Sequence, residues 1–261
     1  HKEIKLETKL KYGTTINFAT LNLRGIKRLG KREKIEHRMT RKNIHIALIQ
    51  ETHINLNVGE IRKHYTRFFS GSPEKNNSEN KNCHTEAGVA IVIRNEYLNY
   101  IWDVQPESDR IISMTLGYSI PISFISTYLP TAPSNPDFKN ECYKQLQQTQ
   151  IKLQKKGPTY TMGDFNARVQ TRQSSNELCI GSHTFDKSNI TLAEQDEAVV
   201  ENRNYFITHC NLTDCVVMNT FFQKPEHKKP TFRHCETTHG PPWTRYRGYE
   251  TLDYILAPNR W

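Results

Sequence analysis

The chain has 261 residues, of which 36% are hydrophobic and 24% are charged, and a formal net charge of +9. This length can bury a substantial core as one large domain or two small ones. The longest apolar run, at residues 89–93, is too short to span a bilayer, so no membrane partner is expected. The positive charge favours a polyanionic partner, most commonly nucleic acid, over the alternative of a merely basic soluble protein.

Apolar alternation and β-branched residues predict a series of short strands between a few helices. A helix over 31–42 would place Ile35 and Met39 on one face, a helix over 137–156 would be capped by Asp137, and another is expected at about 194–209. In chain order, the predicted strands cover 16–23, 44–50, 65–69, 88–93, 110–116, 122–128, 159–162, 212–219 and 251–256. This alternation, without a repeat or a linker, predicts one layered α/β domain.

Charge and composition distinguish the connecting segments. Segments 70–85 and 235–250 are predicted to be loops, the second of them rich in aromatic and basic residues. The six cysteines show neither a CxxC pair nor zinc-ligand spacing, so they are expected to be buried or incidental. Positive charge is concentrated between Arg24 and Lys42, which holds nine basic residues (Arg24, Lys27, Arg28, Lys31, Arg32, Lys34, Arg38, Arg41 and Lys42).

The motif Gly163-Asp164-Phe165-Asn166 directly follows the predicted strand 159–162. In an extended backbone, residues 164 and 166 would share one face. Asp164 could orient a water molecule or accept its proton, and Asn166 could donate a hydrogen bond to a phosphate oxygen without adding negative charge. This pairing suits the hydrolysis of a phosphoester.

Four further polar residues occur at or within predicted strands. Glu51 ends an apolar strand, where a carboxylate together with phosphate oxygens would form a typical Mg²⁺ environment, although a strand-end glutamate in solvent is the alternative. Tyr128 could donate to a phosphate or support the leaving group, or simply cover the core. Asn22 is either functional or closes a turn, and Asp253 could hold a histidine in one tautomer.

The ordered set formed by these residues resembles the endonuclease/exonuclease/phosphatase superfamily with its DNase I-like fold. The strings TLNLRG, ALIQETH, GDFNARV, NTFF, PTF and LDYIL are similar to the apurinic-type endonuclease domain of LINE-type (non-LTR) retrotransposons. The resemblance covers residues 15–261 and leaves residues 1–14 as an N-terminal extension. It implies a four-layered α/β sandwich with two packed mixed or antiparallel sheets flanked by helices.

The resemblance also implies a role for each matching residue. Glu51 would be a ligand of Mg²⁺ (or Mn²⁺) and Asn22 would support the metal site. Tyr128 would contact the scissile phosphate, Asp164 would align the attacking water, and Asn166 would stabilise the transition state. Contacts to DNA are expected from Arg24, Lys27, Arg168, Thr231 and a hairpin that carries Trp243, Arg245 and Arg247, for which a surface loop pinned to the body is the alternative.

The sequence departs from the family pattern near its end. The family's Ser-Asp-His motif and last core strand are expected after LDYIL and are absent from the 261 residues. The missing aspartate would be a metal ligand and the missing histidine the acid/base partner of Asp253. Three explanations are open as alternatives: the sequence is cut short, another chain supplies the strand, or the domain has been repurposed.

Three functions follow as hypotheses. The first is a Mg²⁺-dependent endonuclease that nicks target DNA in the nucleus for a reverse transcriptase outside this chain. The second is a non-catalytic domain that binds nucleic acid or protein in a larger assembly. The third is a phosphatase or phosphodiesterase that acts on lipid, inositol phosphate or RNA tails. The basic surface favours nucleic acid over small phosphoesters.

Overall fold

The computed structural model divides the chain into two compact units. The first unit comprises residues 1–128 and 150–163, and the second comprises residues 129–149 and 164–261. The structure describes residues 9–11, 13–28, 30–72, 87–185, 195–233 and 248–260. Of the helices in these ranges, none is both long enough and apolar enough to cross a membrane.

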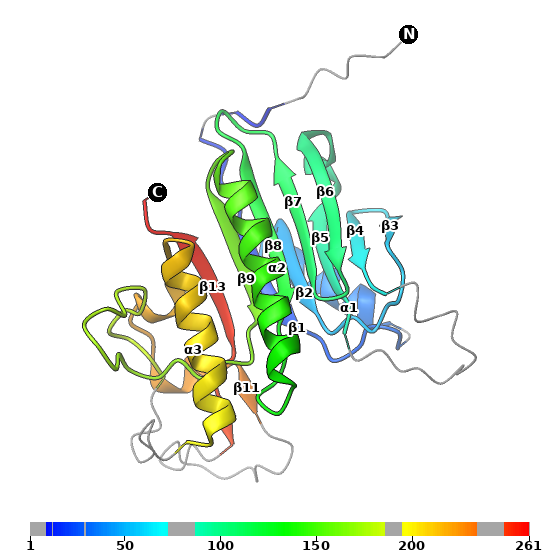
Figure 1. Ribbon diagram of the computed structural model, residues 1–261. Coiled ribbons are helices and arrows are strands. Elements are labelled where there is room, and N and C mark those ends of the chain that lie inside the picture. The colour runs from blue at the N-terminus through cyan, green and yellow to red at the C-terminus, as the bar shows by residue number, and fades with distance from the viewer. Residues whose placement is uncertain are drawn as a thin grey trace. The chain divides into compact units, whose positions relative to one another are not determined.

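Five described strands of the first unit form one sheet in the order β1-β2-β5-β4-β3 (Figure 1). They are β1 (Phe18–Asn22), β2 (Ile46–Gln50), β3 (Val58–Ile61), β4 (Tyr65–Ser70) and β5 (Val89–Arg94). β1 runs parallel to β2, and the other pairs are antiparallel. A parallel pair needs a crossover, which contains helix α1 (Lys31–Arg41).

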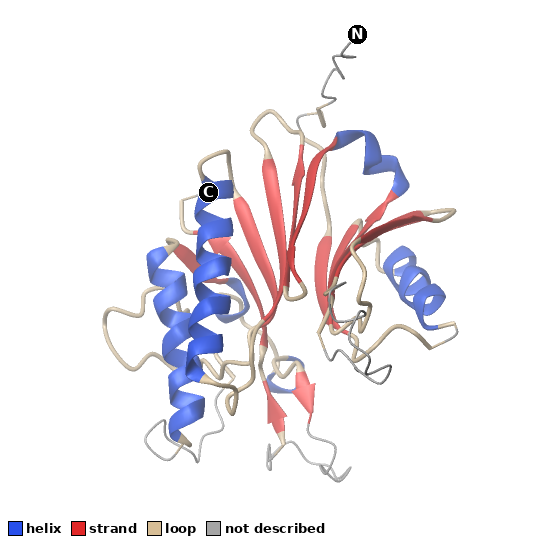
Figure 2. Ribbon diagram, turned by 45° about the vertical axis from the view of Figure 1, so that its right-hand side comes forward, coloured by secondary structure: helices blue, strands red, loops and turns tan. Residues whose placement is uncertain are grey.

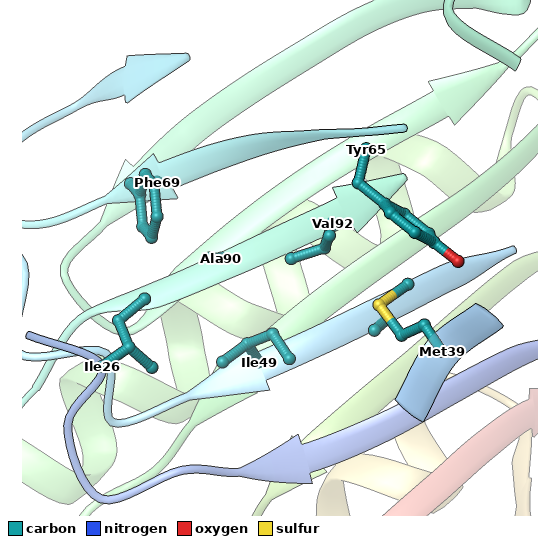
Figure 3. Close-up of a cluster of buried hydrophobic side chains, with 8 residues drawn as sticks. Ile26, Met39, Ile49, Tyr65, Phe69, Ala90 and Val92 are labelled. Atoms are coloured by element: carbon teal, nitrogen blue, oxygen red, sulfur yellow. The ribbon is translucent and has the colours of Figure 1, made fainter. Parts of the chain in front are cut away.

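Helix α1 covers this sheet with an apolar face. Met39 packs with Ile49, Tyr65 and Val92 in one buried cluster (Figure 3). The partly buried Ile35 packs against this cluster. The predicted face of this helix is therefore confirmed. Burying an apolar side chain of this size stabilises a fold by roughly 1.5–3 kcal/mol, so the cluster anchors the crossover between β1 and β2.

A second sheet packs face to face on the first within the same unit. Phe18 meets Phe124 with ring centroids 5.4 Å apart. The buried Gln50 donates its Nε2 proton to Ser126 Oγ over 2.9 Å. The strands of this sheet in the first unit follow the order β9-β8-β7-β6. They are β6 (Ile101–Ser108), which follows the 3₁₀ helix η2 (Asn95–Tyr100), then β7 (Ile111–Leu116), β8 (Ile122–Tyr128) and β9 (Thr159–Asp164).

The second unit contains two long helices side by side, the paired long blue helices of Figure 2. Tyr143 stacks on Tyr205 with centroids 5.3 Å apart, and the buried Lys139 pairs with Glu201 at 2.6 Å. The helices are α2 (Pro136–Gln154, whose residues from 150 onward belong to the first unit) and α3 (Glu197–Leu212). The remaining elements are β10 (Cys215–Val217), η4 (Met218–Thr220), η5 (Glu226–Lys228), β11 (Phe232–Arg233), β12 (Tyr249–Glu250) and β13 (Asp253–Pro258). β10 pairs with β13 and β11 with β12, both antiparallel.

Several predicted boundaries differ from the structure. Asp137 does not cap α2, because the Asn135 side chain accepts the Asp137 N–H at 2.8 Å and Pro136 opens the helix. The strand predicted over 212–219 shrinks to β10, because α3 continues to Leu212.

Four strands and parts of two predicted loops complete the comparison. β3, β6, β11 and β12 were not predicted: β3 is mostly exposed, β6 carries polar residues and Pro106, and β11 and β12 have two residues each. Ser70 ends β4, and the rest of the first predicted loop from residue 73 onward lies outside the described residues, as do residues 235–247 of the second, whose end forms β12. Cys142, Cys179, Cys210 and Cys215 are buried free thiols. The predicted boundary at residue 15 stays a prediction.

The buried His209 of α3 makes the stability of the second unit sensitive to pH. Burial lowers the pKa of His209 from 6.5 to about 4. The unfolded chain therefore binds a proton between pH 6.5 and 4 that the folded chain does not, and stability falls as pH falls through this window. At about 1.4 kcal/mol per unit, we expect a loss of about 3 kcal/mol.

Urea unfolding at pH 7 and at pH 4.5 measures this effect. His209→Gln removes the titrating group, so its unfolding free energy should fall less between the two pH values than that of the wild type. The exposed His64→Gln is the matched control and should fall as the wild type does. An equal fall for His209→Gln and the wild type would show that His209 is not the source.

Candidate active site

In the first unit, Asn22 and Glu51 meet where β1 and β2 end. The two strands are parallel, with Asn22 opposite Gln50, so both end at the same edge of the sheet. Asn22 Nδ2 donates to Glu51 Oε1 over 2.7 Å. Asn22 Oδ1 also accepts the backbone N–H of Arg24 at 3.1 Å. Asn22 thus closes a turn and orients the carboxylate at once, and the structure brings the two predicted residues together.

The backbone around Glu51 is held in an uncommon conformation. Glu51, His53 and Arg24 have φ values of 51°, 59° and 49°. Each such residue costs on the order of 1–2 kcal/mol and persists only where its surroundings fix it. Here Glu51 O accepts from Gly25 N at 2.6 Å, and the N–H groups of Thr52 and His53 donate to the backbone at Gly88 and Ala87. Strain of this kind is concentrated at functional sites.

The donor set around Glu51 fits a hard divalent cation. The Glu51 side chain is 19% exposed, and its Oε2 lies 3.9 Å from His53 Nε2. Mg²⁺ binds through one or two carboxylates and keeps several waters. Within the described ranges, no group of three or more His, Cys, Asp or Glu side chains is placed to hold a metal. A cation on Glu51 and Asn22 would therefore complete its shell with water and phosphate oxygens.

Arg110, which was not predicted from the sequence, contacts Tyr128 through two hydrogen bonds and a cation–π contact. Tyr128 N–H donates to Arg110 O at 2.9 Å, and Arg110 Nη1 donates to Tyr128 O at 3.2 Å. The guanidinium lies 4.9 Å from the centre of the Tyr128 ring, within the range of a cation–π contact. Tyr128 is only 8% exposed. The contacts with Arg110 therefore hold a largely buried ring in one position.

In the second unit, Asp164 and Asn166 form a tight turn. Asp164 is buried, and its Oδ1 accepts the Asn166 N–H at 2.9 Å. Asn166 has a φ of 50°, so the two side chains do not share an extended face as predicted. Asn166 Nδ2 donates to Leu129 O, and Asn202 Nδ2 donates to Asn166 O. The turn thereby fixes both predicted side chains in single orientations.

Asp253 lies beside Thr231 at the start of β13. Thr231 Oγ1 accepts the N–H groups of Leu252 and Asp253, both at 3.1 Å. Asn219, from the NTFF string, donates to Asp253 O and accepts the Ile255 N–H. Thr231 thus has a structural role, and its predicted contact with DNA stays a prediction. Because Phe165 N also donates to Leu252 O, the Asp164 turn is tied to the residue before Asp253.

The other residues predicted to contact DNA fall into three groups. Arg24 and Lys27 are exposed in the connection between β1 and α1. Arg168 Nε pairs with the buried Glu250 at 3.1 Å within the second unit, and its contact with DNA stays a prediction. Trp243, Arg245 and Arg247 lie outside the described residues.

Gly163 is required by a close approach of two backbones in the first unit. A Cβ atom at this position would lie 1.8 Å from Thr127 O, a clash that only a backbone shift could relieve. We expect Gly163→Ala to destabilise the protein by about 3 kcal/mol in urea unfolding. Gly59→Ala is the control, because its Cβ would meet only the Phe68 ring at 3.6 Å. Equal stability of the two variants would contradict this role.

The sequence matches the model of one protein family, and the structure is similar to several solved structures. The model of the Endonuclease/Exonuclease/phosphatase family matches residues 19–261. The AP endonuclease LMAP from Leishmania major is 14% identical and has a TM-score of 0.64, over 99% of this chain and 86% of its own. The endonuclease domain of TRAS1, a telomere-specific non-LTR retrotransposon, is 15% identical with a TM-score of 0.56, over 94% and 85%. The 3′-5′ exonuclease NExo from Neisseria meningitidis is 15% identical with a TM-score of 0.58, over 92% and 85%.

The comparison with curated proteins found no match. At such low identities the solved structures show the fold alone. That fold is the DNase I-like α/β sandwich, with two packed mixed sheets and flanking helices. The resemblance seen in the sequence is thereby confirmed at the level of the superfamily. Because the family model spans nearly all of the sequence, the chain belongs to the endonuclease/exonuclease/phosphatase family.

Proposed function

We propose that the chain is a divalent-metal-dependent DNA endonuclease that hydrolyses a phosphodiester, with target-site nicking for a LINE-type retrotransposon as its role. The observation that carries this proposal is the pairing of Asn22 with Glu51, which orients a metal-binding carboxylate. The net charge of +9 and the exposed Arg24 and Lys27 support a DNA substrate. The solved domain of TRAS1 supports the retrotransposon role, as a likeness only.

The proposed division of labour follows the geometry of each residue. Nucleases of this family generally use divalent metals. A cation held by Glu51 and Asn22 would supply Lewis acidity and a counter-charge to the phosphate. Asp164, fixed by its turn, would orient the attacking water and accept its proton. Tyr128, fixed by Arg110, would donate its hydroxyl proton toward the phosphate or the leaving group.

Asn166 retains hydrogen-bonding capacity for the proposed transition state. A carboxamide nitrogen carries two protons, and the bond to Leu129 O uses one of them. The second proton would serve the phosphate oxygen that gains charge as the phosphodiester is cleaved. Because Asn202 and Leu129 hold the turn, this donor would be oriented before substrate binds.

Plasmid nicking tests the proposed activity. The 261-residue chain should convert supercoiled plasmid to open circles with Mg²⁺ and should not do so with EDTA. Glu51→Gln should abolish most of the activity, whereas the exposed Glu96→Gln should retain it. The nick should carry a 3′-hydroxyl that a DNA polymerase extends, because priming requires one.

Other outcomes identify the competing functions. Binding of DNA with a steep salt dependence but without nicking would contradict the proposal and support a non-catalytic domain. Release of phosphate from a 3′-phosphorylated oligonucleotide without nicking would instead support a phosphatase. Nicking that survives both EDTA and Glu51→Gln would refute the assignment of the metal site.

With the retrotransposon role we also propose that the protein is located in the nucleus and that a reverse transcriptase acts on the same nick. A fluorescent fusion in cells of the source organism tests the location. Extension of the nicked strand on an RNA template, after addition of a reverse transcriptase, tests the coupling. A nick that cannot be extended would contradict the role in priming even if the endonuclease activity is present.

A further inference from the structure

His53 is fixed beside Glu51 by its backbone and by a glycine. Its φ of 59° places it in the left-handed region two residues after Glu51. Its N–H donates to Ala87 O at 3.0 Å. A Cβ atom at Gly25 would lie 2.9 Å from His53 Nδ1, so the ring packs where only a glycine leaves room. The imidazole is therefore held in position on the side of Glu51.

The Nε2 atom of His53 is buried and, among the residues that the structure describes, has no hydrogen-bond partner. A buried polar atom without a partner is energetically unfavourable, so this nitrogen is available to a ligand. Nε2 lies 3.9 Å from Glu51 Oε2. This separation is too long for a hydrogen bond, which ends near ~3.2 Å. The separation of the two atoms is shorter than the sum of two metal–ligand bonds of ~2.1 Å each, so one cation can contact both atoms.

The chemistry of imidazole decides which cation this pair would prefer. Mg²⁺ selects oxygen ligands and gives up its waters reluctantly. First-row transition ions accept a neutral imidazole nitrogen together with carboxylate oxygen. An imidazole beside the carboxylate therefore adds affinity for a transition ion and adds little for Mg²⁺.

We infer that His53 Nε2 is a further ligand of the cation on Glu51 and Asn22, and that it makes the site bind Mn²⁺ in preference to Mg²⁺. The inference rests on the metal site of the proposed function, but it does not require DNA cleavage. A protonated His53 that simply pairs with the Glu51 carboxylate is the competing arrangement, and metal binding distinguishes the two.

Electron paramagnetic resonance of Mn²⁺ bound to the full chain, without DNA, tests the inference. Spin-echo modulation should show a directly bound ¹⁴N nucleus in the wild type. His53→Asn should remove that signal and weaken Mn²⁺ binding by about tenfold or more. Mg²⁺ affinity, measured by competition at the same site, should change by less than about twofold. Asparagine is chosen because it tolerates the left-handed backbone.

Two controls and one second variant make the result decisive. The exposed His64→Gln should keep both the signal and the affinity, and Glu51→Gln should lose both. His53→Ala, checked for folding by thermal unfolding, should reproduce His53→Asn. The inference is overturned if the wild type binds no Mn²⁺, shows no nitrogen coupling, or keeps that coupling in both His53 variants.

The outcome is separable from that of the proposed function. A wild-type chain that binds nitrogen-coupled Mn²⁺ but never nicks plasmid would contradict the endonuclease proposal and leave the role of His53 intact. A chain that nicks plasmid with Mg²⁺ but shows no nitrogen coupling would do the reverse.

Discussion

Asp164→Asn is expected to lower the single-turnover rate of DNA nicking by about 10³-fold, within the range of roughly 10²–10⁴ that a positioned general base contributes. The substitution keeps an oxygen at Oδ1 to accept the Asn166 N–H, so the turn should survive. It removes the negative charge that would orient the water and take its proton. A supercoiled plasmid, with enzyme in excess, measures the rate.

A control variant at a second aspartate tests whether the loss of rate is specific to Asp164 or follows from removing any carboxylate charge. Asp196 of the same unit also accepts a backbone N–H two residues ahead, from Ala198, at the start of α3. Asp196→Asn should therefore nick at the wild-type rate. A rate for Asp164→Asn within tenfold of the wild type would remove Asp164 from the proposed chemistry.

Arg203→Met is expected to produce the largest loss of stability, about 3–5 kcal/mol, because it leaves a buried charge without its partner. Arg203 is 1% exposed and binds both oxygens of Glu177 at 2.7 Å. Its remaining donors reach Val169 O at 2.7 Å and Thr171 O at 3.2 Å. This one side chain thus anchors the segment that follows the Asp164 turn.

The pKa of Glu177 gives this prediction a pH dependence. Burial by itself would raise the pKa of Glu177, but hydrogen bonds from Arg203 and the Gln173 N–H, with the charges of Arg203 and Arg172, lower it overall. The stabilisation is therefore present above the usual pKa and is lost as pH falls through the lowered one. The difference between the wild type and Arg203→Met should shrink in acid.

Urea unfolding of matched variants measures the contribution of this pair. The double variant Arg203→Met with Glu177→Leu removes both charges and should recover most of the lost stability. Arg260→Met breaks an exposed pair with Asp214 and should leave the midpoint unchanged. If Arg203→Met unfolds at the wild-type urea concentration, the buried pair is not the anchor described here.

Sequence patterns predicted the parts of the fold that depend on local periodicity. β2, β5, β7 and β8 are apolar runs with clear ends, and all four were predicted within a few residues. The meeting of Asn22 and Glu51 was implied only by the resemblance to the superfamily, and the parallel pairing of β1 and β2 explains it. The strongest predictions were therefore those in which burial alone determines the structure.

Side-chain geometry at the site could not be predicted in the same way. The Asx-type turn of Asp164 and Asn166 is itself local, but the bonds to Leu129 and Asn202 that hold it reach distant segments. The left-handed backbone at Glu51 is likewise held by bonds to segments far along the chain. The ion pair of Arg168 with Glu250 was not predicted, because Glu250 lies 82 positions away and nothing in the local sequence indicates it. Arg110 was missed because its contact with Tyr128 depends on the pairing of β7 and β8.

Single-turnover cleavage of a 5′-labelled duplex, followed across Mg²⁺ concentrations, tests most directly whether Glu51 and Asp164 serve one metal-dependent hydrolysis in different roles. Glu51→Gln should raise the Mg²⁺ concentration for half-maximal rate by about tenfold or more. Asp164→Asn should leave that concentration unchanged and lower the maximal rate. Wild-type curves for both variants, or cleavage that persists in EDTA, would contradict the assignment of both residues.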